Sequence, residues 1–178
     1  MSVFRKFVRD HRGVAAVEFA LIAPAMILLY SGLVEVCQAV IAARKANHVA
    51  SAIGDLVSQV EIVSSSDVSD IFGIGQTIMA PYPTTTLQMR LTSVTLNSSG
   101  TPKVDWSRGS GGLGAYSAGA TVSLPATLGL VANDSVVMAE AKYQYNSILK
   151  SVMPNALNFN EAFYLRPRRS DKVTCSNC

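Results

Sequence analysis

The sequence has little charge and very little histidine. Only 15% of its 178 residues are charged, and its two histidines, His11 and His48, lie far apart in the chain. A structural zinc site needs about four ligands, and acid–base catalysis needs titratable groups held beside a reacting atom. No combination of serine, histidine and aspartate stands out, and neither does a pair of carboxylates. We therefore expect no metal, no cofactor and no enzymatic activity.

A large excess of charge of one sign is also missing. The net charge is +3, and the basic residues lie mainly at the front of the chain and near its end. A nucleic-acid-binding domain normally carries a basic patch or stripe, so no nucleic-acid partner is expected. The late basic cluster allows two interpretations, a solvated chain end or a contact with anionic lipid or an acidic partner. It contains Arg166, Arg168, Arg169 and Lys172.

The sequence does contain a long apolar run. No charged residue occurs from Phe19 to Val34, and residues 14–43 are otherwise apolar, small or aromatic apart from Glu18, Glu35 and Gln38. About 20 helical residues cross a hydrocarbon core of about 30 Å. We predict a leader at 1–13, a membrane-spanning helix at 14–43 and an exported domain at 44–178. The excess of basic residues before the span favours a cytoplasmic N-terminus.

Glu18 is the unusual residue of this run. A carboxylate is unfavourable by about 2.5 to 3.5 kcal/mol at the bilayer centre and by less near the interface, so it normally has a partner. Cleavage after Gly13 would give Val14 a positively charged amino group and would place Glu18 near the positive end of a helix dipole. Cleavage would thus create the missing partner, on the same subunit or on a neighbour. For Glu35, the far membrane interface and a pairing role both stay open.

The segment Arg12-Gly13-Val14-Ala15-Ala16-Val17-Glu18-Phe19 resembles the processing site of type IV prepilins. With the following Ala20 to Pro24, Gly32 and Glu35, it resembles the TadE-like pseudopilins of tight-adherence (Tad, Flp) pilus systems. The resemblance implies cleavage between Gly13 and Val14 by a prepilin peptidase, with Glu18 at the fifth mature position. It also implies other pilins or pseudopilins and assembly-platform proteins of the inner membrane as partners. Major pilins of these systems are much shorter, so a minor, pilin-like component is implied.

Other interpretations of the N-terminus compete with this one. A secretory signal could be cut behind Val40-Ile41-Ala42, but its apolar core would be long and Glu18 would be unexplained. A lipoprotein signal would use Cys37, but Glu35 and Val36 occupy positions that need small residues. An uncleaved signal anchor would hold an exported binding or enzymatic domain. A minor pseudopilin of a related secretion system is the other alternative.

After the span, the sequence predicts an α+β domain. The helical period continues through Val49, Ile53 and Val60, and residues 64–66 offer the N-cap of a second helix, which Gly73 and Gly75 weaken and Pro81 ends. The period then changes to two, which predicts a hairpin from residues 87–106, a strand at 135–145 and a last strand near 159–165. A long amphipathic helix packed on a small antiparallel sheet is the architecture that the pilin resemblance also implies.

Three smaller motifs carry weaker predictions. Pro24 inside the span should bend or locally unwind the helix. Gly109 to Gly114 fits G-x-G-x-x-G, but no apolar strand precedes it and no convincing helix follows, so we expect a flexible loop, with a short strand at 121–124. Cys175 and Cys178 form C-x-x-C in a polar, flexible tail, and either a small disulfide loop or two free thiols fits an oxidising compartment.

Overall fold

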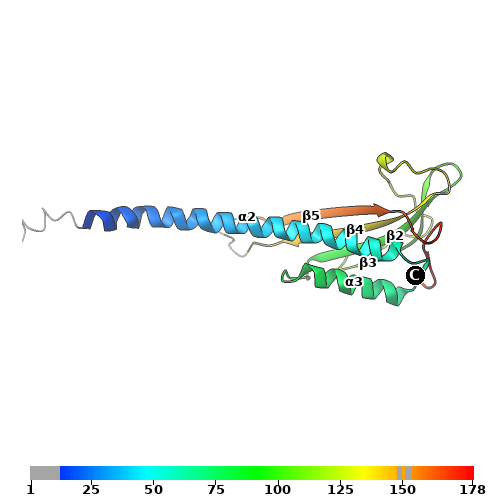
Figure 1. The fold of residues 1–178 in the computed structure, drawn as a ribbon, viewed down its shortest axis with the longest axis horizontal. Helices are drawn as coiled ribbons and strands as arrows, with labels where there is room; N and C mark the ends of the chain where they lie inside the picture. Colours follow the sequence, from blue (N-terminus) through cyan, green and yellow to red (C-terminus); the bar gives the residue numbers. More distant parts are fainter. Residues whose placement is uncertain (1–12, 148–149, 151–153) are drawn as a thin grey trace, which may run out of the picture. The chain divides into compact units, whose positions relative to one another are not determined.

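The computed structural model describes residues 13–147, 150 and 154–178 of the chain (Figure 1). Apart from Gly13, the predicted leader therefore lies outside the described residues. The chain forms two units. One contains the chain up to Gln38 together with Ser147–Asn155, and the other contains Ala39–Asn146 and Ala156–Cys178. The second unit holds the whole sheet.

Helix α2 (Val14–Ser58) is one continuous helix of 45 residues. In its second half, buried residues recur every three or four positions, as an amphipathic helix packed on one side requires. These residues are Ala39, Ala42, Ala46, Val49, Ile53 and Val57. The predicted continuation of the apolar helix into an amphipathic one is therefore confirmed.

The sheet has four antiparallel strands. They are β2 (Leu87–Leu96), β3 (Pro102–Ser110), β4 (Ser135–Tyr145) and β5 (Leu157–Leu165), in the order β3-β2-β4-β5. β2 pairs with the next strand of the chain, β3, and β4 pairs with the next strand, β5. The two pairs are joined side by side by the pairing of β2 with β4. The predicted α+β class is confirmed, and the predicted strand at 135–145 has the observed bounds.

Helix α3 (Ser65–Met79) begins at the predicted cap. Ser64 and Asp67 form a capping box, in which the Asp67 N–H donates to Ser64 Oγ at 3.2 Å and the Ser64 N–H donates to Asp67 Oδ2 at 2.8 Å. The hydrogen bonds from the side chain and the backbone of Ser64 lower the pKa of Asp67. This box satisfies two backbone donors that a helix start leaves without partners, which explains why the helix begins here.

The main core lies between the helices and one face of the sheet. It joins the buried stripe of α2 to one side of α3 and to alternate residues of β2 and β4. The sheet contributes Leu87, Met89, Leu91, Val137, Ala139, Ala141, Tyr143 and Tyr145, and α3 contributes Val68, Ile71, Phe72 and Met79. The alternation that the sequence predicts for β2 and β4 is therefore the alternation of buried residues on this face.

Two glycines let the helices lie close to their neighbours. A Cβ on Gly54 would lie 2.6 Å from Leu165 Cδ1 and 2.8 Å from Ala139 Cβ. A Cβ on Gly75 would lie 2.6 Å from Met89 Sδ, where α3 meets β2. The sequence analysis counted Gly75 against a helix, whereas the structure uses its missing side chain for packing.

Gly54→Ala should destabilise the protein even though alanine favours helices. Overpacking a close contact costs about 1 to 3 kcal/mol, and the gain in helix propensity is up to about 1 kcal/mol. We expect a net loss of stability of up to about 2 kcal/mol. Denaturant unfolding of the full-length protein in detergent, followed by the fluorescence of the single tryptophan, Trp106, would measure it.

Gly73→Ala is the matched control, because Gly73 lies in α3 with nothing within 4 Å of its missing Cβ. This substitution should stabilise the protein by about 0.5 to 1 kcal/mol, since only the conformational freedom of the unfolded chain changes. Equal effects of the two substitutions would show that the contact at Gly54 is not tight.

The opposite face of the sheet carries a second, smaller core. Val94, Val104, Val122 and Val136 form it, and Tyr116, Ala120, Leu124, Leu130 and Tyr164 pack against them. The chain between β3 and β4 therefore folds over this face. The flexible loop predicted at Gly109 to Gly114 is wrong for its first two residues, which belong to β3.

The predicted short strand at 121–124 is also wrong, because Thr121 forms only an isolated bridge with Lys103. This segment instead closes part of the outer edge of β3. The Val104 N–H donates to the carbonyl of Ala120 at 3.0 Å, and the Gly119 N–H donates to the carbonyl of Val104 at 2.8 Å.

A β-bulge at Asp105 lets β3 serve both cores. Trp106 pairs with Ser93 and Val104 pairs with Val94, so Asp105 is the extra residue. The Asp105 carboxylate accepts hydrogen bonds from Thr95 Oγ1 at 2.6 Å and from Ser93 Oγ at 3.2 Å. Strict alternation would put the side chains of residues 104 and 106 on one face, whereas the bulge sends them to opposite faces.

The chain end is packed, which differs from the polar, flexible tail of the sequence analysis. Strand β6 (Thr174–Cys175) pairs in parallel with β1 (Ile62–Val63). Val173 is fully buried, and its carbonyl accepts a hydrogen bond from Trp106 Nε1 at 2.8 Å. Strands of two residues leave no periodic pattern in a sequence, so this pairing could not be predicted.

Candidate processing and assembly segment

The predicted cleavage site lies at the start of α2. Val14 is the first residue of the helix, and Gly13 directly precedes it. Both residues are exposed, and no described atom lies within 4 Å of the position that a Cβ on Gly13 would take. Within the described residues the peptide bond between them is accessible. Cleavage there would leave Val14 as a free N-terminus on the first turn of a helix.

Glu18 lies one helical turn after Val14. Residues four positions apart in a helix share one face, and side chains lean toward the helix N-terminus, so the Glu18 carboxylate extends toward the Val14 backbone nitrogen. The Glu18 side chain is exposed, and no salt bridge within the described part of the chain involves it. The structure therefore leaves this carboxylate accessible to a charged group at the new N-terminus.

Large apolar side chains surround Glu18 without any cover from the described chain. Phe19 is 72% exposed and Leu21 is 74% exposed. Further exposed members of this surface are Val17, Ile22, Met26, Ile27, Leu28, Leu29, Tyr30 and Leu33. An exposed apolar surface of this size is unusual on a soluble monomer and indicates a membrane or a partner. By length and composition α2 can cross a membrane, as the predicted single anchor requires.

Pro24 does not interrupt the helix. The α-helix is continuous from Val14–Ser58, although proline cannot donate the backbone hydrogen bond at this position. The local unwinding predicted at Pro24 is therefore absent from the structure, and the bend stays a prediction.

Glu35 differs from Glu18 in being shielded. Glu35 is 3% exposed, whereas Glu18 is exposed. Of the two predicted roles for Glu35, this burial favours an interaction within the protein over simple contact with the membrane interface. The single negative charge presented by the apolar stretch from 14 to 34 is therefore that of Glu18.

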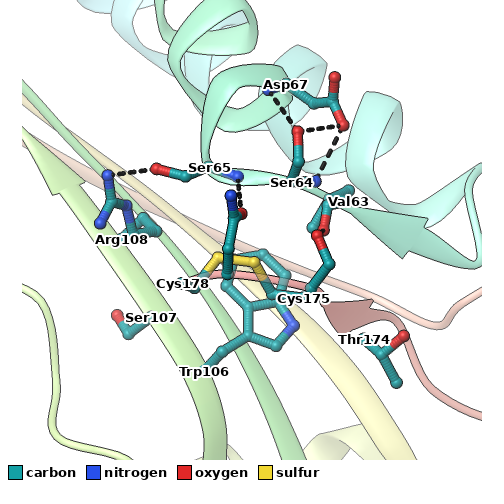
Figure 2. Close-up of a disulfide and its surroundings, with 12 residues drawn as sticks. Val63, Ser64, Ser65, Asp67, Trp106, Ser107, Arg108, Thr174, Cys175 and Cys178 are labelled. Atoms are coloured by element: carbon teal, nitrogen blue, oxygen red, sulfur yellow. Dashed lines mark hydrogen bonds between the residues drawn. A yellow bond between two sulfur atoms is a disulfide. The ribbon is translucent and has the colours of Figure 1, made fainter.

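The other predicted pair, Cys175 and Cys178, lies beside the start of α3 (Figure 2). Their sulfur atoms are bonded, and their Cα atoms are 5.7 Å apart. Between them, Asn177 Oδ1 accepts a hydrogen bond from the backbone N–H of Ser65 at 2.6 Å. Arg108 of β3 donates to Ser65 Oγ, also at 2.6 Å. The Asn177 bond fastens the C-terminal loop to the first turn of α3, and the Arg108 bond fastens β3 to the same turn, so both contacts have a structural role.

A buried ion pair on the outer face of the sheet was missed by the sequence analysis. Arg90 of β2 donates to both carboxylate oxygens of Glu140 on β4, at 2.6 and 2.8 Å. Its Nη1 donates to the carbonyl of Gly114 at 2.9 Å, and its Nη2, which also bonds Glu140, donates to the hydroxyl of Tyr116 at 2.6 Å. The two residues are 50 positions apart, and nothing local in the sequence indicated that β2 and β4 are neighbours.

This ion pair carries its charge inside the protein. The side chains of Arg90 and Glu140 are 10% and 15% exposed. Burial alone would lower the pKa of Arg90, but the hydrogen bond and the charge of Glu140 outweigh it, so the pKa of Arg90 is raised. Arg90 therefore stays ionised, and it holds the loop that covers the second core through its bonds to Gly114 and Tyr116.

The glycine-rich motif does not form a phosphate-binding loop. Gly111 and Gly112 have positive φ angles of 68° and 95°, which make a turn directly after β3. A phosphate loop requires a helix that opens at the end of the motif, and in the described chain no helix begins at Gly114 or in the ten residues after it. The described residues also contain no group of three side chains that could hold a metal ion.

Comparison with known proteins identifies the N-terminal segment. Residues 13–54 match the model of a family described as TadE-like protein. The match begins at Gly13 and covers most of α2. No curated protein and no solved structure matches the chain.

Proposed function

We propose that this chain, a TadE-like protein over residues 13–54, is a minor pilin-like component for the assembly or initiation of a Tad-type pilus. The family match carries the proposal, because it begins at the predicted cleavage site and covers the exposed apolar part of α2. The partners we propose are a prepilin peptidase, other pilins or pseudopilins, and the assembly-platform proteins of the inner membrane.

The proposed topology follows from charge and hydropathy. Residues 14–43 would span the bacterial inner membrane once, and the basic residues before them would hold the N-terminus in the cytoplasm. The domain from 44 would then lie in the periplasm, where a disulfide between Cys175 and Cys178 is stable. The same domain could also be carried into the pilus.

The proposed mechanism of assembly joins helices through Glu18. After cleavage, its carboxylate pairs with the ammonium group of Val14 on the same or an adjacent subunit. A charge-assisted hydrogen bond between them is strong because the surrounding bilayer offers few competing partners. Pairing fixes the axial position of one helix against the next, while the alanines of the segment let the helices approach closely.

Processing gives the direct test of this function. Protein purified from its host membranes should begin at Val14, and its intact mass should be smaller by the mass of residues 1–13. Gly13→Val should leave the chain uncleaved, because a prepilin peptidase requires a small residue before the scissile bond. N-terminal sequencing and intact-mass measurement distinguish the two forms.

The control is Gly73→Ala, which alters a glycine of the exported domain and should be processed as fully as the native chain. Native protein that still starts at Met1, in cells with active peptidase, would favour the alternative of a domain held by an uncleaved anchor. A minor pseudopilin of a related secretion system would also be cleaved, and the neighbouring genes would identify it.

A further inference from the structure

The two edges of the sheet differ in a way that points to a binding surface. β3 forms one edge, and residues 119–121 close part of it through the bonds to Val104 and the bridge to Lys103. β5 forms the other edge (Figure 1). Within the described part of the chain, β5 pairs with β4 alone, and no other described backbone group bonds to it.

β5 also lacks most of the features that protect an edge strand. Its nine residues contain no proline, glycine or lysine. Alternate residues of an edge strand direct their N–H and C=O groups away from the sheet, so β5 presents a row of backbone donors and acceptors about 30 Å long. Such a row is complementary to another extended chain.

The side chains of β5 indicate which residues a bound partner strand should carry. Phe159 and Phe163 lie on the helix side of the strand, half-buried against the main core, and Glu161 lies between them. Asn47 of α2 donates to Glu161 Oε2 at 3.2 Å, which positions the carboxylate without neutralising it. No salt bridge in the described part of the chain includes Glu161.

The other side of this edge is polar. Asn158 and Asn160 are exposed, and together with Gln88, Lys142 and Gln144 they line a hollow of about 420 Å³ on the outer face of the sheet. Polar side chains of an added strand would face these amides, whereas its apolar side chains would continue the row of Phe159 and Phe163.

We propose that the edge of β5 binds an extended segment of another protein as a fifth strand of the sheet. The segment would carry a lysine or arginine opposite Glu161 and an apolar residue two positions away on each side. The inference deepens the proposed function and rests on it only for the source of the partner, another component of the assembly.

Glu161 also argues against a second copy of this chain as the occupant. A symmetric dimer requires antiparallel pairing of β5 with itself, and the register that pairs the whole strand places Glu161 opposite Glu161. Like charges directly opposite each other destabilise a strand pair, whereas opposite charges stabilise it. The charge therefore selects a different, cationic strand.

The test uses full-length protein in detergent and two nine-residue peptides. Both alternate valine and threonine, and one has lysine at its centre while the other has glutamate. The lysine peptide should slow backbone hydrogen exchange in β5, leave the central strand β2 unchanged, and bind about five- to tenfold more tightly than the glutamate peptide. Glu161→Lys should reverse this preference. Glu61→Lys, the same change at an exposed carboxylate outside the sheet, should keep it.

Three results would overturn the proposal. Neither peptide slows exchange in β5, or Glu161→Lys leaves the preference unchanged, or β5 is already protected at high protein concentration without peptide, which identifies a dimer. None of these measurements depends on cleavage at Gly13. If β5 binds no peptide, the evidence on cleavage after Gly13 is unaffected. If the N-terminus is not cleaved, the evidence on strand binding at β5 is unaffected.

Discussion

Glu18→Ala should reduce assembled pili by about tenfold or more while the exported domain keeps its fold. The substitution removes the proposed pairing with the Val14 ammonium, and a hydrogen bond to a charged group contributes about 1.5 to 3 kcal/mol. In the structure Glu18 is exposed on α2, and neither of the two described cores includes it. Its loss therefore has no route to the stability of the domain.

Glu18→Ala should act in opposite directions on pilus assembly and on membrane insertion, so the two can be distinguished. Removing a carboxylate from an apolar helix makes insertion easier, because an intramembrane charge costs up to about 2.5 to 3.5 kcal/mol. A defect of Glu18→Ala therefore cannot arise from poor insertion. Glu18→Asp keeps the charge one methylene closer to the helix, so it should retain part of the activity.

The measurement compares two readouts on the same full-length protein. Pili on the cell surface report assembly, and denaturant unfolding of the purified protein, followed by Trp106 fluorescence, reports the domain. Glu61→Ala is the matched control, since it removes an exposed carboxylate outside the apolar helix and should change neither readout. Equal loss of pili and of stability in Glu18→Ala would contradict the proposed mechanism.

The sequence predicted those features that depend on neighbouring residues. The anomaly at Glu18 and the junction at Gly13 are local as well, because they lie within six residues of each other, and cleavage there stays a prediction. The capping box needs only Ser64 and Asp67, which are three positions apart. The strand at 135–145 is set by its own alternation of apolar and polar residues. Each of these patterns lies within a short stretch of consecutive residues, so it can be interpreted without knowing which segments pack together in the fold.

Features that join distant segments could not be predicted in this way. Arg90 and Glu140 are 50 positions apart, and each alone resembles a solvated residue on the polar face of a strand. Alternation shows which face a side chain occupies, but it does not show which strand lies beside it. The bulge at Asp105 makes even the face hard to predict, because one inserted residue reverses the face of every side chain that follows it in the strand.

Glu140→Ala should be among the most destabilising single changes in the domain. It leaves the guanidinium of Arg90 buried without its counter-charge, and breaking a buried pair in this way costs about 3 to 5 kcal/mol, somewhat less here because both side chains keep slight exposure. Arg90 also donates to Gly114 and Tyr116. The loop over the second core should therefore become sensitive to protease.

The loss of stability in Glu140→Ala should come mainly from the unpaired charge of Arg90 rather than from the lost contact between the two side chains. Replacing both partners, as Arg90→Met with Glu140→Leu, should recover most of the stability, because apolar residues of similar volume need no counter-charge. Arg166→Ala is the control for an exposed pair. Arg166 is 60% exposed and lies 3.3 Å from Asp134, so its removal should cost less than about 1 kcal/mol.

Denaturant unfolding and limited proteolysis of the full-length protein measure both consequences of Glu140→Ala. A double variant as unstable as Glu140→Ala would show that hydrogen bonding to the loop, and not the buried charge, dominates at this site. A loop that resists protease in Glu140→Ala would show that Arg90 can hold it without Glu140. In either case Arg90 would hold the cover of the second core through its hydrogen bonds to Gly114 and Tyr116 rather than through its charge pairing with Glu140.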